Sequence, residues 1–333
     1  MTESGAPARI EAPARVAGFG TFVPARILSN ADLERMLDTS DEWIVQRTGI
    51  RERRMVSEGE YASTMAFRAI DDLLANNEEI DLSTTDYIIV ASTTSDYVYP
   101  SLAAMIQLEY RLSKNAGAID ISAACAGYAY TVNLAAGLIA SGQAQRVLVV
   151  ATEALSLSAD YTDRATAVLF GDGAAAAVVE KSDVAQILGM TAGADGSAGP
   201  ALYRTNMRTE IAGIEDPARK LRQKGQDVYR WVMENIPGAV FRTLERAGMM
   251  IDDIDWFVPH SANLRMIEAL NKRLKISMEK TLLSVCDYGN TSAVSIPLAL
   301  VPAIRDGRVK RGDKILEIGF GGGLVTAANV LIY

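Results

Sequence analysis

Apolar residues along the chain form short continuous runs that alternate with longer stretches in which they recur at helical spacing. The run 147–150 is apolar at every position, which is typical of a strand in a sheet covered on both faces. We expect strands over residues 16–20, 87–92, 118–121, 146–152 and 174–180. We expect helices over residues 30–37, 64–76, 101–112, 127–141, 228–247, 261–274 and 295–305. This alternation predicts an α/β protein.

The two halves of the chain share a weak internal similarity. Residues 86–90 have the pattern of residues 255–259, and the Phe-Gly turn at 170–173 has that of the turn at 320–323. Each of these turns is followed by an apolar strand-like run. Because the two pairs occur in the same order, they indicate two duplicated α/β units.

This repeat divides the chain into a first half over residues 16–185 and a second half over residues 186–333. Residues 1–15 are rich in Ala, Pro and Arg and lack the apolar run of a signal peptide, so we expect a flexible tail. Residues 182–226 mix Gly, Asp, Pro and both charges, which predicts a connector that runs over the surface.

Composition narrows the class of protein further. The net charge of −8 argues against general nucleic-acid binding, because a phosphate backbone attracts a basic surface. No apolar run is long enough for a membrane-spanning helix, so we expect no membrane partner. Two cysteines without a signal peptide favour a cytoplasmic protein that has no disulfide framework.

His260 is the only histidine in the chain. Any mechanism that needs an imidazole must therefore use it, and a metal site built from several histidines is excluded. It follows the apolar run 254–258 and Pro259, and it precedes a helical stretch. Reacting groups in α/β proteins collect at the carboxyl ends of strands. We therefore interpret His260 as a functional residue.

Cys125 lies where an apolar strand passes through small residues into a helix that is apolar on nearly all sides. Unpaired N–H groups and the positive end of the dipole at a helix start favour thiolate over thiol. Cys125 is therefore a candidate nucleophile, and the alternative is a small buried hydrophobic residue. Cys286 lies in a strand-like apolar context without such an activator, so we expect it in the core.

Two glycine-containing turns could supply hydrogen-bond donors. Gly289 relaxes the turn before Asn290, whose amide could point into a site, although Gly-Asn-Thr-Ser is also an ordinary turn and cap. The glycines at 321–323 would let the backbone approach a ligand and offer an N–H group to an oxyanion; the alternative is a simple turn. No Lys-Ser or Lys-Thr pair follows them, so they do not form a phosphate-binding loop.

Five segments together resemble β-ketoacyl-(acyl-carrier-protein) synthase III, the initiating condensing enzyme of type II fatty acid synthesis. In order they are DTSDEWIVQRTGIRER (38–53), AACAG (123–127), PHSANLR (259–265), GNTS (289–292) and FGGG (320–323). The resemblance implies the thiolase fold, with two βαβαβαββ halves in a five-layered α/β/α/β/α core. It also implies a homodimer that needs no cofactor and no metal.

The resemblance implies how the candidate residues divide the reaction. Cys125 takes the acyl group from an acyl-CoA primer, and the N–H groups of Cys125 and Gly322 hold the oxyanion. His260 and Asn290 donate hydrogen bonds to the thioester carbonyl of malonyl-acyl carrier protein, which stabilises the enolate formed by loss of CO₂. The carbanion then attacks the acyl-enzyme and gives a 3-oxoacyl product.

The resemblance also assigns binding residues. Four residues would contact CoA, with an aromatic ring stacked on the adenine: Trp43, Arg47, Arg164 and Asn263. Three basic residues would receive the acidic carrier protein: Arg265, Lys272 and Arg273. Tyr99 resembles the aromatic residue that closes the acyl pocket of the partner subunit.

Residues 96–100 and Ser261, where many family members have Gln, look most like the enzymes of Gram-positive bacilli that favour branched-chain primers. We therefore expect a short branched-chain or acetyl primer. Two other functions remain open: an acyltransferase of specialised metabolism that forms an ester or amide, and a non-catalytic partner subunit. The joint presence of Cys125, His260 and Asn290 favours decarboxylating condensation over both.

Overall fold

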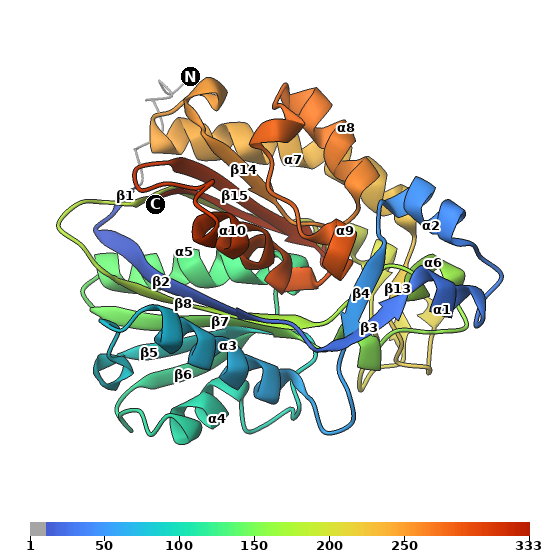
Figure 1. The fold of residues 1–333 in the computed structure, drawn as a ribbon, viewed down its shortest axis with the longest axis horizontal. Helices are drawn as coiled ribbons and strands as arrows, with labels where there is room; N and C mark the ends of the chain where they lie inside the picture. The colour runs from blue at the N-terminus through green and yellow to red at the C-terminus, as the bar shows by residue number, and fades with distance from the viewer. Residues whose placement is uncertain (1–10) are drawn as a thin grey trace.

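Two five-stranded sheets form the centre of the computed structural model, which describes residues 11–333. Helices lie between the sheets and on both outer faces, so the layers follow the order α/β/α/β/α (Figure 1). This confirms the five layers implied by the resemblance. The expected strands and helices all form, and their ends differ from the expected ones by at most three residues.

The first sheet has the strand order β2-β8-β7-β5-β6. Its strands are β2 (Ala14–Phe22), β8 (Gly173–Lys181), β7 (Arg146–Glu153), β5 (Tyr87–Ala91) and β6 (Gly117–Ile121). The strands β5, β6 and β7 are parallel, whereas β8 is antiparallel to both of its neighbours. Two helices cover the outer face of this sheet, α3 (Ala62–Asn76) and α4 (Leu102–Glu109).

The second sheet has the strand order β1-β9-β16-β15-β14. Its strands are β1 (Glu11–Ala12), β9 (Ile187–Ala194), β16 (Val325–Ile332), β15 (Lys314–Gly321) and β14 (Trp256–Pro259). Two helices lie on its outer side, α7 (Gly225–Ala247) and α8 (Leu264–Leu274).

The internal repeat is confirmed by strand order and direction. The series β9-β16-β15-β14 repeats β2-β8-β7-β5, with the same parallel and antiparallel pairings. The similar segments 86–90 and 255–259 lie on the equivalent strands β5 and β14. The two sheets differ at their edges. The strand β1 extends the second sheet beside β9. At the opposite edge, beside β14, an isolated bridge between Phe257 and Thr281 takes the place that β6 has in the first sheet.

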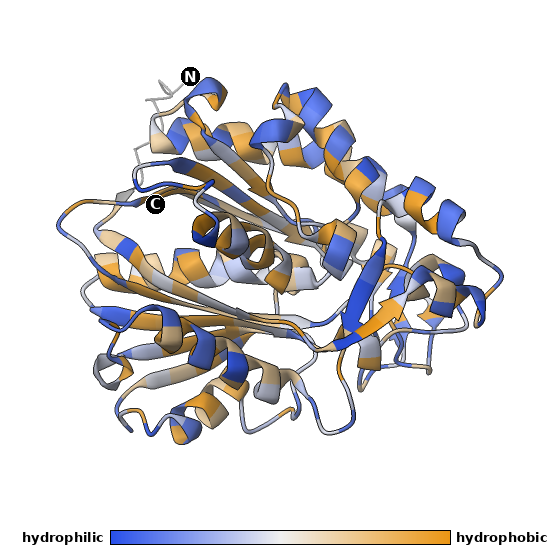
Figure 2. Cartoon of the chain, viewed as in Figure 1, coloured by the Kyte–Doolittle hydropathy of each residue, from blue (hydrophilic) through white to orange (hydrophobic). Residues whose placement is uncertain are grey.

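Two helices fill the layer between the sheets, α5 (Gly127–Ala140) and α10 (Ser295–Arg305). α5 packs on β7 of the first sheet and on β16 of the second. It is apolar on nearly all sides, and its buried residues include Tyr128, Val132 and Ile139. A helix of this composition is stable only when most of its surface is covered, which explains its position between the two sheets (Figure 2).

Short elements gather at the end of the layers away from the C-terminus (Figure 1). They include four short helices, α1 (Asn30–Glu34), α2 (Asp41–Thr48), α6 (Arg164–Ala167) and α9 (Val285–Tyr288). They also include three strand pairs: β3 (Arg26–Ser29) with β4 (Glu52–Met55), β10 (Leu202–Tyr203) with β13 (Arg222–Gln223), and β11 (Glu210–Ile211) with β12 (Ile214–Glu215). The hydroxyls of Ser29 and Ser40 accept hydrogen bonds from the first turns of α1 and α2, which fixes where these helices begin.

The expected tail over residues 1–15 was wrong at its C-terminal end, because β1 pairs with β9 and Ala14 begins β2. The remainder of that prediction lies outside the described residues. The surface connector expected over 182–226 was also wrong in part, because 187–194 forms β9 inside the second sheet. Gly189 does not end this strand. A Cβ there would lie 2.3 Å from the Thr243 carbonyl oxygen, so glycine lets α7 pack closely on β9.

Two local expectations also need correction. The helix expected from residue 261 begins at Leu264, because Asn263 is extended and its side chain caps the helix by accepting from two N–H groups. Cys286 lies in α9 rather than in a strand, and it is only half-buried. None of the helices in residues 11–333 is long and apolar enough to cross a membrane.

Candidate active site

Cys125 lies where the first sheet meets the central helix. β6 ends at Ile121, and a short 3₁₀ turn, η2 (Ala124–Ala126), carries Cys125 directly before α5. Ala124 has a φ of 43°, an unfavourable value for a residue with a Cβ and one that tends to occur at functional sites. The Cys125 side chain is 7% exposed.

Glycines of β15 let the second sheet approach this turn. A Cβ on Gly321 would lie 2.6 Å from the Cβ of Cys125 and 2.7 Å from its sulfur. A Cβ on Gly319 would lie 2.6 Å from the Cα of Ala126. Only glycine fits at both positions, so this segment serves a close backbone approach and is more than a turn.

His260 follows directly on β14 and is 1% exposed. Its Nδ1 atom lies 2.7 Å from the hydroxyl oxygen of Ser295, the first residue of α10. Its ring makes an edge contact with Phe320, with the centroids 5.4 Å apart. Burial lowers the pKa of His260 to about 3, against an opposing hydrogen bond to the Ser292 backbone, so the ring is neutral at neutral pH.

Asn290 follows α9 and Gly289, and it is 6% exposed. Its N–H donates to the Leu169 carbonyl oxygen at 2.8 Å, and its own carbonyl oxygen accepts from Gly171 at 3.0 Å. The side-chain Oδ1 accepts from the N–H of Ser292 at 2.9 Å. Because the carbonyl end of the amide is held in this way, its NH₂ group is the end available to a ligand.

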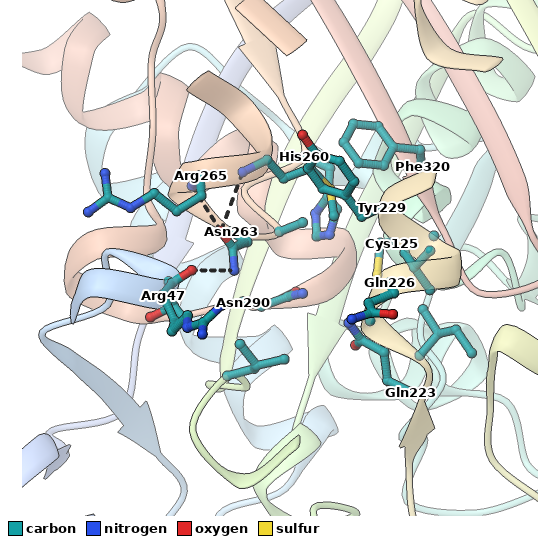
Figure 3. A pocket seen from close by; sticks show the side chains of 18 of the residues that line it. Arg47, Cys125, Gln223, Gln226, Tyr229, His260, Asn263, Arg265, Asn290 and Phe320 are labelled. Carbon is teal, nitrogen blue, oxygen red and sulfur yellow. Dashed lines mark hydrogen bonds between the residues drawn. The ribbon is translucent and has the colours of Figure 1, made fainter. Parts of the chain in front are cut away.

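The structure brings Cys125, His260 and Asn290 to the lining of one cavity of about 760 Å³ (Figure 3). Cys125 also lines a second cavity of about 430 Å³, together with Gly322. The sulfur therefore stands between two spaces, one shared with His260 and Asn290 and one beside the glycine loop.

The sequence of this chain is similar to those of known proteins. Residues 119–196 match the family model of 3-oxoacyl-[acyl-carrier-protein] synthase III, and residues 244–333 match the model of its C-terminal part. β-Ketoacyl-[acyl-carrier-protein] synthase III 2 of Bacillus subtilis is 48% identical over 96% of this chain and 98% of its own length. The chain belongs to the 3-oxoacyl-[acyl-carrier-protein] synthase III family.

Two solved structures of similar proteins have the same fold. The β-ketoacyl-[acyl carrier protein] synthase III from Thermus thermophilus superimposes with a TM-score of 0.92 at 42% identity, over 96% of this chain and 99% of that one. The priming β-ketosynthase of the R1128 polyketide pathway superimposes with a TM-score of 0.89 at 37% identity, over 99% and 98%. The thiolase fold implied by the sequence is thereby confirmed.

The thiol of Cys125 is protonated in this resting synthase III structure. Burial raises its pKa to about 11, and the nearby Glu153 carboxylate acts in the same direction. The Ser292 hydroxyl and the N–H groups of Gly322 and Cys125 oppose the shift. The thiolate expected at the helix start is therefore wrong for the resting protein, because burial outweighs the helix end.

Glu153 is a buried residue of the site that the sequence analysis missed. It ends β7, is 0% exposed, and accepts hydrogen bonds from Thr93, Thr94 and Ser292. Burial raises its pKa to about 7. A carboxylate at the end of a buried strand, two residues after the apolar run 147–151, is the signal that could have found it, by the strand-end argument applied to His260.

Three of the four residues expected to bind CoA line the large cavity: Trp43, Arg47 and Asn263. Arg164 does not line it, but its guanidinium lies 4.7 Å from the centroid of the Trp43 ring and donates to the Asp38 carbonyl oxygen at 2.8 Å. Asn263 donates to the Arg47 carbonyl oxygen at 3.3 Å while capping α8, which links the two sides of the cavity mouth (Figure 3).

Of the residues expected to meet the carrier protein, Arg265 and Arg273 line the large cavity, whereas Lys272 is exposed outside it. Arg265 donates to the Gln46 carbonyl oxygen at 2.9 Å and pairs with Glu268 at 3.0 Å, so it also joins α8 to α2.

Tyr99 lines neither of the cavities that contain Cys125 and is 85% exposed.

Sequence analysis also missed the wall opposite Arg47, which is formed by three polar side chains near the start of α7: Gln223, Gln226 and Tyr229 (Figure 3). Two of these lie within the segment expected to be a surface connector.

Proposed function

We propose that this chain catalyses the decarboxylating Claisen condensation of an acyl-CoA primer with malonyl-acyl carrier protein, which initiates type II fatty acid synthesis. The observation that carries the proposal is the meeting of Cys125, His260 and Asn290 in one cavity. Membership of the synthase III family supports the same reaction. A cytoplasmic location is part of this proposal.

In the first half-reaction Cys125 attacks the thioester of acyl-CoA and becomes acylated. CoA occupies the large cavity, and the acyl chain enters the second cavity on the other side of the sulfur. Gly322 lines the second cavity beside Cys125, and the N–H groups of both residues favour negative charge at the sulfur. They are therefore suited to hold the oxyanion of the tetrahedral intermediate.

In the second half-reaction His260 and Asn290 hold the thioester carbonyl of malonyl-acyl carrier protein. A neutral imidazole carries one N–H, and a hydroxyl of Ser295 that donates to Nδ1 leaves that proton on Nε2. The NH₂ group of Asn290 supplies the second donor, because its Oδ1 is engaged by Ser292. Two donors to this carbonyl stabilise the enolate that forms as CO₂ leaves.

CoA would be held at the cavity mouth by Trp43, Arg47, Arg164 and Asn263. Arg164 now covers one face of the Trp43 ring, so an adenine that stacks on this face has to enter between the two side chains. The basic residues Arg265, Lys272 and Arg273 would receive the acidic carrier protein, and two of them lie at the same mouth.

A homodimer would complete the acyl cavity. β6 is an edge strand of the first sheet, and its Ile119 is 51% exposed. Tyr97, Val98 and Tyr99 are also exposed, and exposed apolar groups of this kind are typical of an interface. In the proposed dimer Tyr99 closes the second cavity of the partner subunit.

The primer would be a short acyl group. The second cavity combines an apolar side with polar groups such as Ser158 and Asn206, and its apolar lining includes Leu155, Phe170, Leu202 and Leu221. Short branched chains would fill more of this apolar surface than acetyl does.

Incubation with isobutyryl-CoA and malonyl-acyl carrier protein tests the proposed reaction. Mass spectrometry should detect a branched 3-oxoacyl-acyl carrier protein, and Cys125→Ser should abolish it. Transfer of the acyl group to an alcohol or amine, with no new carbon–carbon bond, would support the ester- or amide-forming alternative. Absence of both products with every primer would support the non-catalytic alternative.

A further inference from the structure

The carboxyl group of Glu153 is buried in a network of neutral donors. One oxygen accepts from the hydroxyl of Thr94 at 2.8 Å, and both lie within reach of the N–H and hydroxyl of Thr93, at 2.9 to 3.2 Å. The hydroxyl of Ser292 donates to Oε1 at 3.2 Å. Among the described residues no salt bridge neutralises this group.

Ser292 connects this carboxyl group to the reacting sulfur. Ser292 and Cys125 line the same second cavity, and the Ser292 hydroxyl, which lowers the pKa of Cys125, donates to Glu153. The residue has a φ of 52°, and its N–H is held by Oδ1 of Asn290 at 2.9 Å. A strained backbone fixed in this way keeps the hydroxyl between the two acids.

Transfer of a proton between Cys125 and Glu153 would avoid a second negative charge in this buried site. If Cys125 lost its proton to bulk water while Glu153 was ionised, two anions would share one buried site, which is unfavourable. Moving the same proton from sulfur to the carboxylate leaves the net charge of the site unchanged. Burial is the main cause of the raised pKa of both Cys125 and Glu153, so a second negative charge is unfavourable in this site.

We propose that Glu153 takes up the thiol proton of Cys125 through the Ser292 hydroxyl during acylation and returns it when condensation frees the sulfur. The inference rests on the proposed role of Cys125 as nucleophile. Glu153 itself does not touch the reacting atoms.

The protons balance over both half-reactions. As the Cys125 sulfur bonds to the acyl carbon, its proton passes to Ser292, and the Ser292 proton passes to Glu153; CoA leaves as a thiolate and is protonated by water. As the carbanion from malonyl-acyl carrier protein bonds to the acyl carbon, the carbon–sulfur bond breaks. The Cys125 thiolate then recovers its proton from Glu153 through the same hydroxyl.

Other titratable groups around the network have different partners. His260 is neutral, hydrogen-bonds the Ser292 backbone and has Nδ1 on Ser295. Arg204 donates to the Thr93 carbonyl oxygen at 3.0 Å. Asp172, which precedes the strand partner of Glu153, accepts from Ser156 and from the N–H of Val56.

Single-turnover acylation by radiolabelled acetyl-CoA or isobutyryl-CoA tests the proposal across about pH 5.5 to about pH 9. In the unmodified protein the rate should rise about tenfold per pH unit up to about pH 7 and then level off, as Glu153 ionises. Glu153→Gln and Ser292→Ala should remove this rise in rate with pH and slow acylation by ~10²-fold at about pH 8.

Two controls separate proton transfer from a loss of structure. Glu317→Gln changes another fully buried carboxyl group, and its acylation rate should depend on pH as in the unmodified protein. Glu153→Gln should retain decarboxylation of malonyl-acyl carrier protein, because this step depends on His260 and Asn290.

An unchanged pH profile in Glu153→Gln would overturn the proposal. Equal loss of acylation at every pH together with loss of decarboxylation would also overturn it, since Glu153 would then only support the site. Failure to label Cys125 in the unmodified protein would instead contradict the nucleophile on which the inference rests.

Discussion

Nδ1 of His260 and the hydroxyl oxygen of Ser295 lie 2.7 Å apart in the buried layer between the two sheets. The same hydroxyl accepts from the N–H of Ser261 at 3.2 Å. Ser295 therefore joins the strand end that carries His260 to the start of α10. If the hydroxyl donates to Nδ1, the ring proton lies on Nε2, the nitrogen that donates to the substrate in the proposed mechanism.

Ser295→Ala should slow malonyl decarboxylation by ~10-fold to ~10²-fold, because the proton on His260 is no longer directed to Nε2. Acylation of Cys125 should keep its rate, since it does not use His260. Release of CO₂ and single-turnover labelling measure the two steps. Ser141→Ala on the exposed end of α5 is the matched control. Equal slowing of both steps would contradict a specific effect on His260.

Labelled acyl-CoA should modify Cys125 alone. Cys125 stands between the two cavities, whereas Cys286 lies in α9 and lines neither of them. Peptide mapping after a single turnover should therefore find label on Cys125, and Cys286→Ser should retain full labelling. Cys125→Ser should lose condensation because a serine hydroxyl ionises far less readily than a thiol. Label on Cys286 would show that the nucleophile is wrongly assigned.

The strand ends explain why much of the site was predictable from sequence. His260 follows β14 and Cys125 precedes α5, so each stands at a junction that an apolar run and its neighbours identify. Asn290 could be placed only through the family resemblance, because its turn has no feature that separates it from an ordinary cap. In the structure Asn290 is held by a parallel bridge to Phe170, which is a contact between distant parts of the chain.

The missed features depend on contacts that a local pattern does not contain. β9 looked like a connector because Gly189 and small polar residues interrupt its apolar run, yet that glycine admits α7. The protonation of Cys125 follows from burial by both halves together, which opposes the effect of the helix start. Tyr99 lines neither cavity of its own chain, and its proposed contact is with a second copy, which the pattern of one chain does not contain.

Asn290→Asp should abolish decarboxylation while leaving acylation of Cys125 intact. The substitution replaces a donor by an acceptor that repels the developing enolate, and loss of one such donor costs ~10² to ~10³ in rate. His260→Ala should act in the same direction. The test compares CO₂ release with acyl labelling for each variant. A variant that decarboxylates but does not acylate would reverse the roles of these residues.

Glu317→Gln should stabilise the protein at alkaline pH. Burial raises the pKa of Glu317 to about 8, and neither of its oxygens has a hydrogen-bond partner within the described residues. Between the unfolded pKa, about 4.3, and about 8, the folded state binds more protons. Its unfolding free energy therefore falls by up to ~1.4 kcal/mol per pH unit as the pH rises.

Urea unfolding of both proteins at several pH values measures this difference. The variant should lack the contribution of Glu317, so its advantage should grow from acid pH to about pH 8 and then level off. A difference that stays constant with pH would show that Glu317 is ionised or solvated in the folded protein.

Branched primers should be used at least as well as acetyl-CoA. The second cavity beside Cys125 has an apolar side, and isobutyryl or 2-methylbutyryl chains would fill more of it than acetyl. Each extra methylene favours the longer primer by only ~1 to ~3 kcal/mol, so acetyl should still react. In the proposed dimer Tyr99→Trp narrows the partner's cavity and should shift preference toward acetyl, whereas Tyr61→Trp on the exposed start of α3 should not. Competition between paired primers measures the preference, and strong selection of acetyl by the unmodified protein would rule out a branched-chain primer.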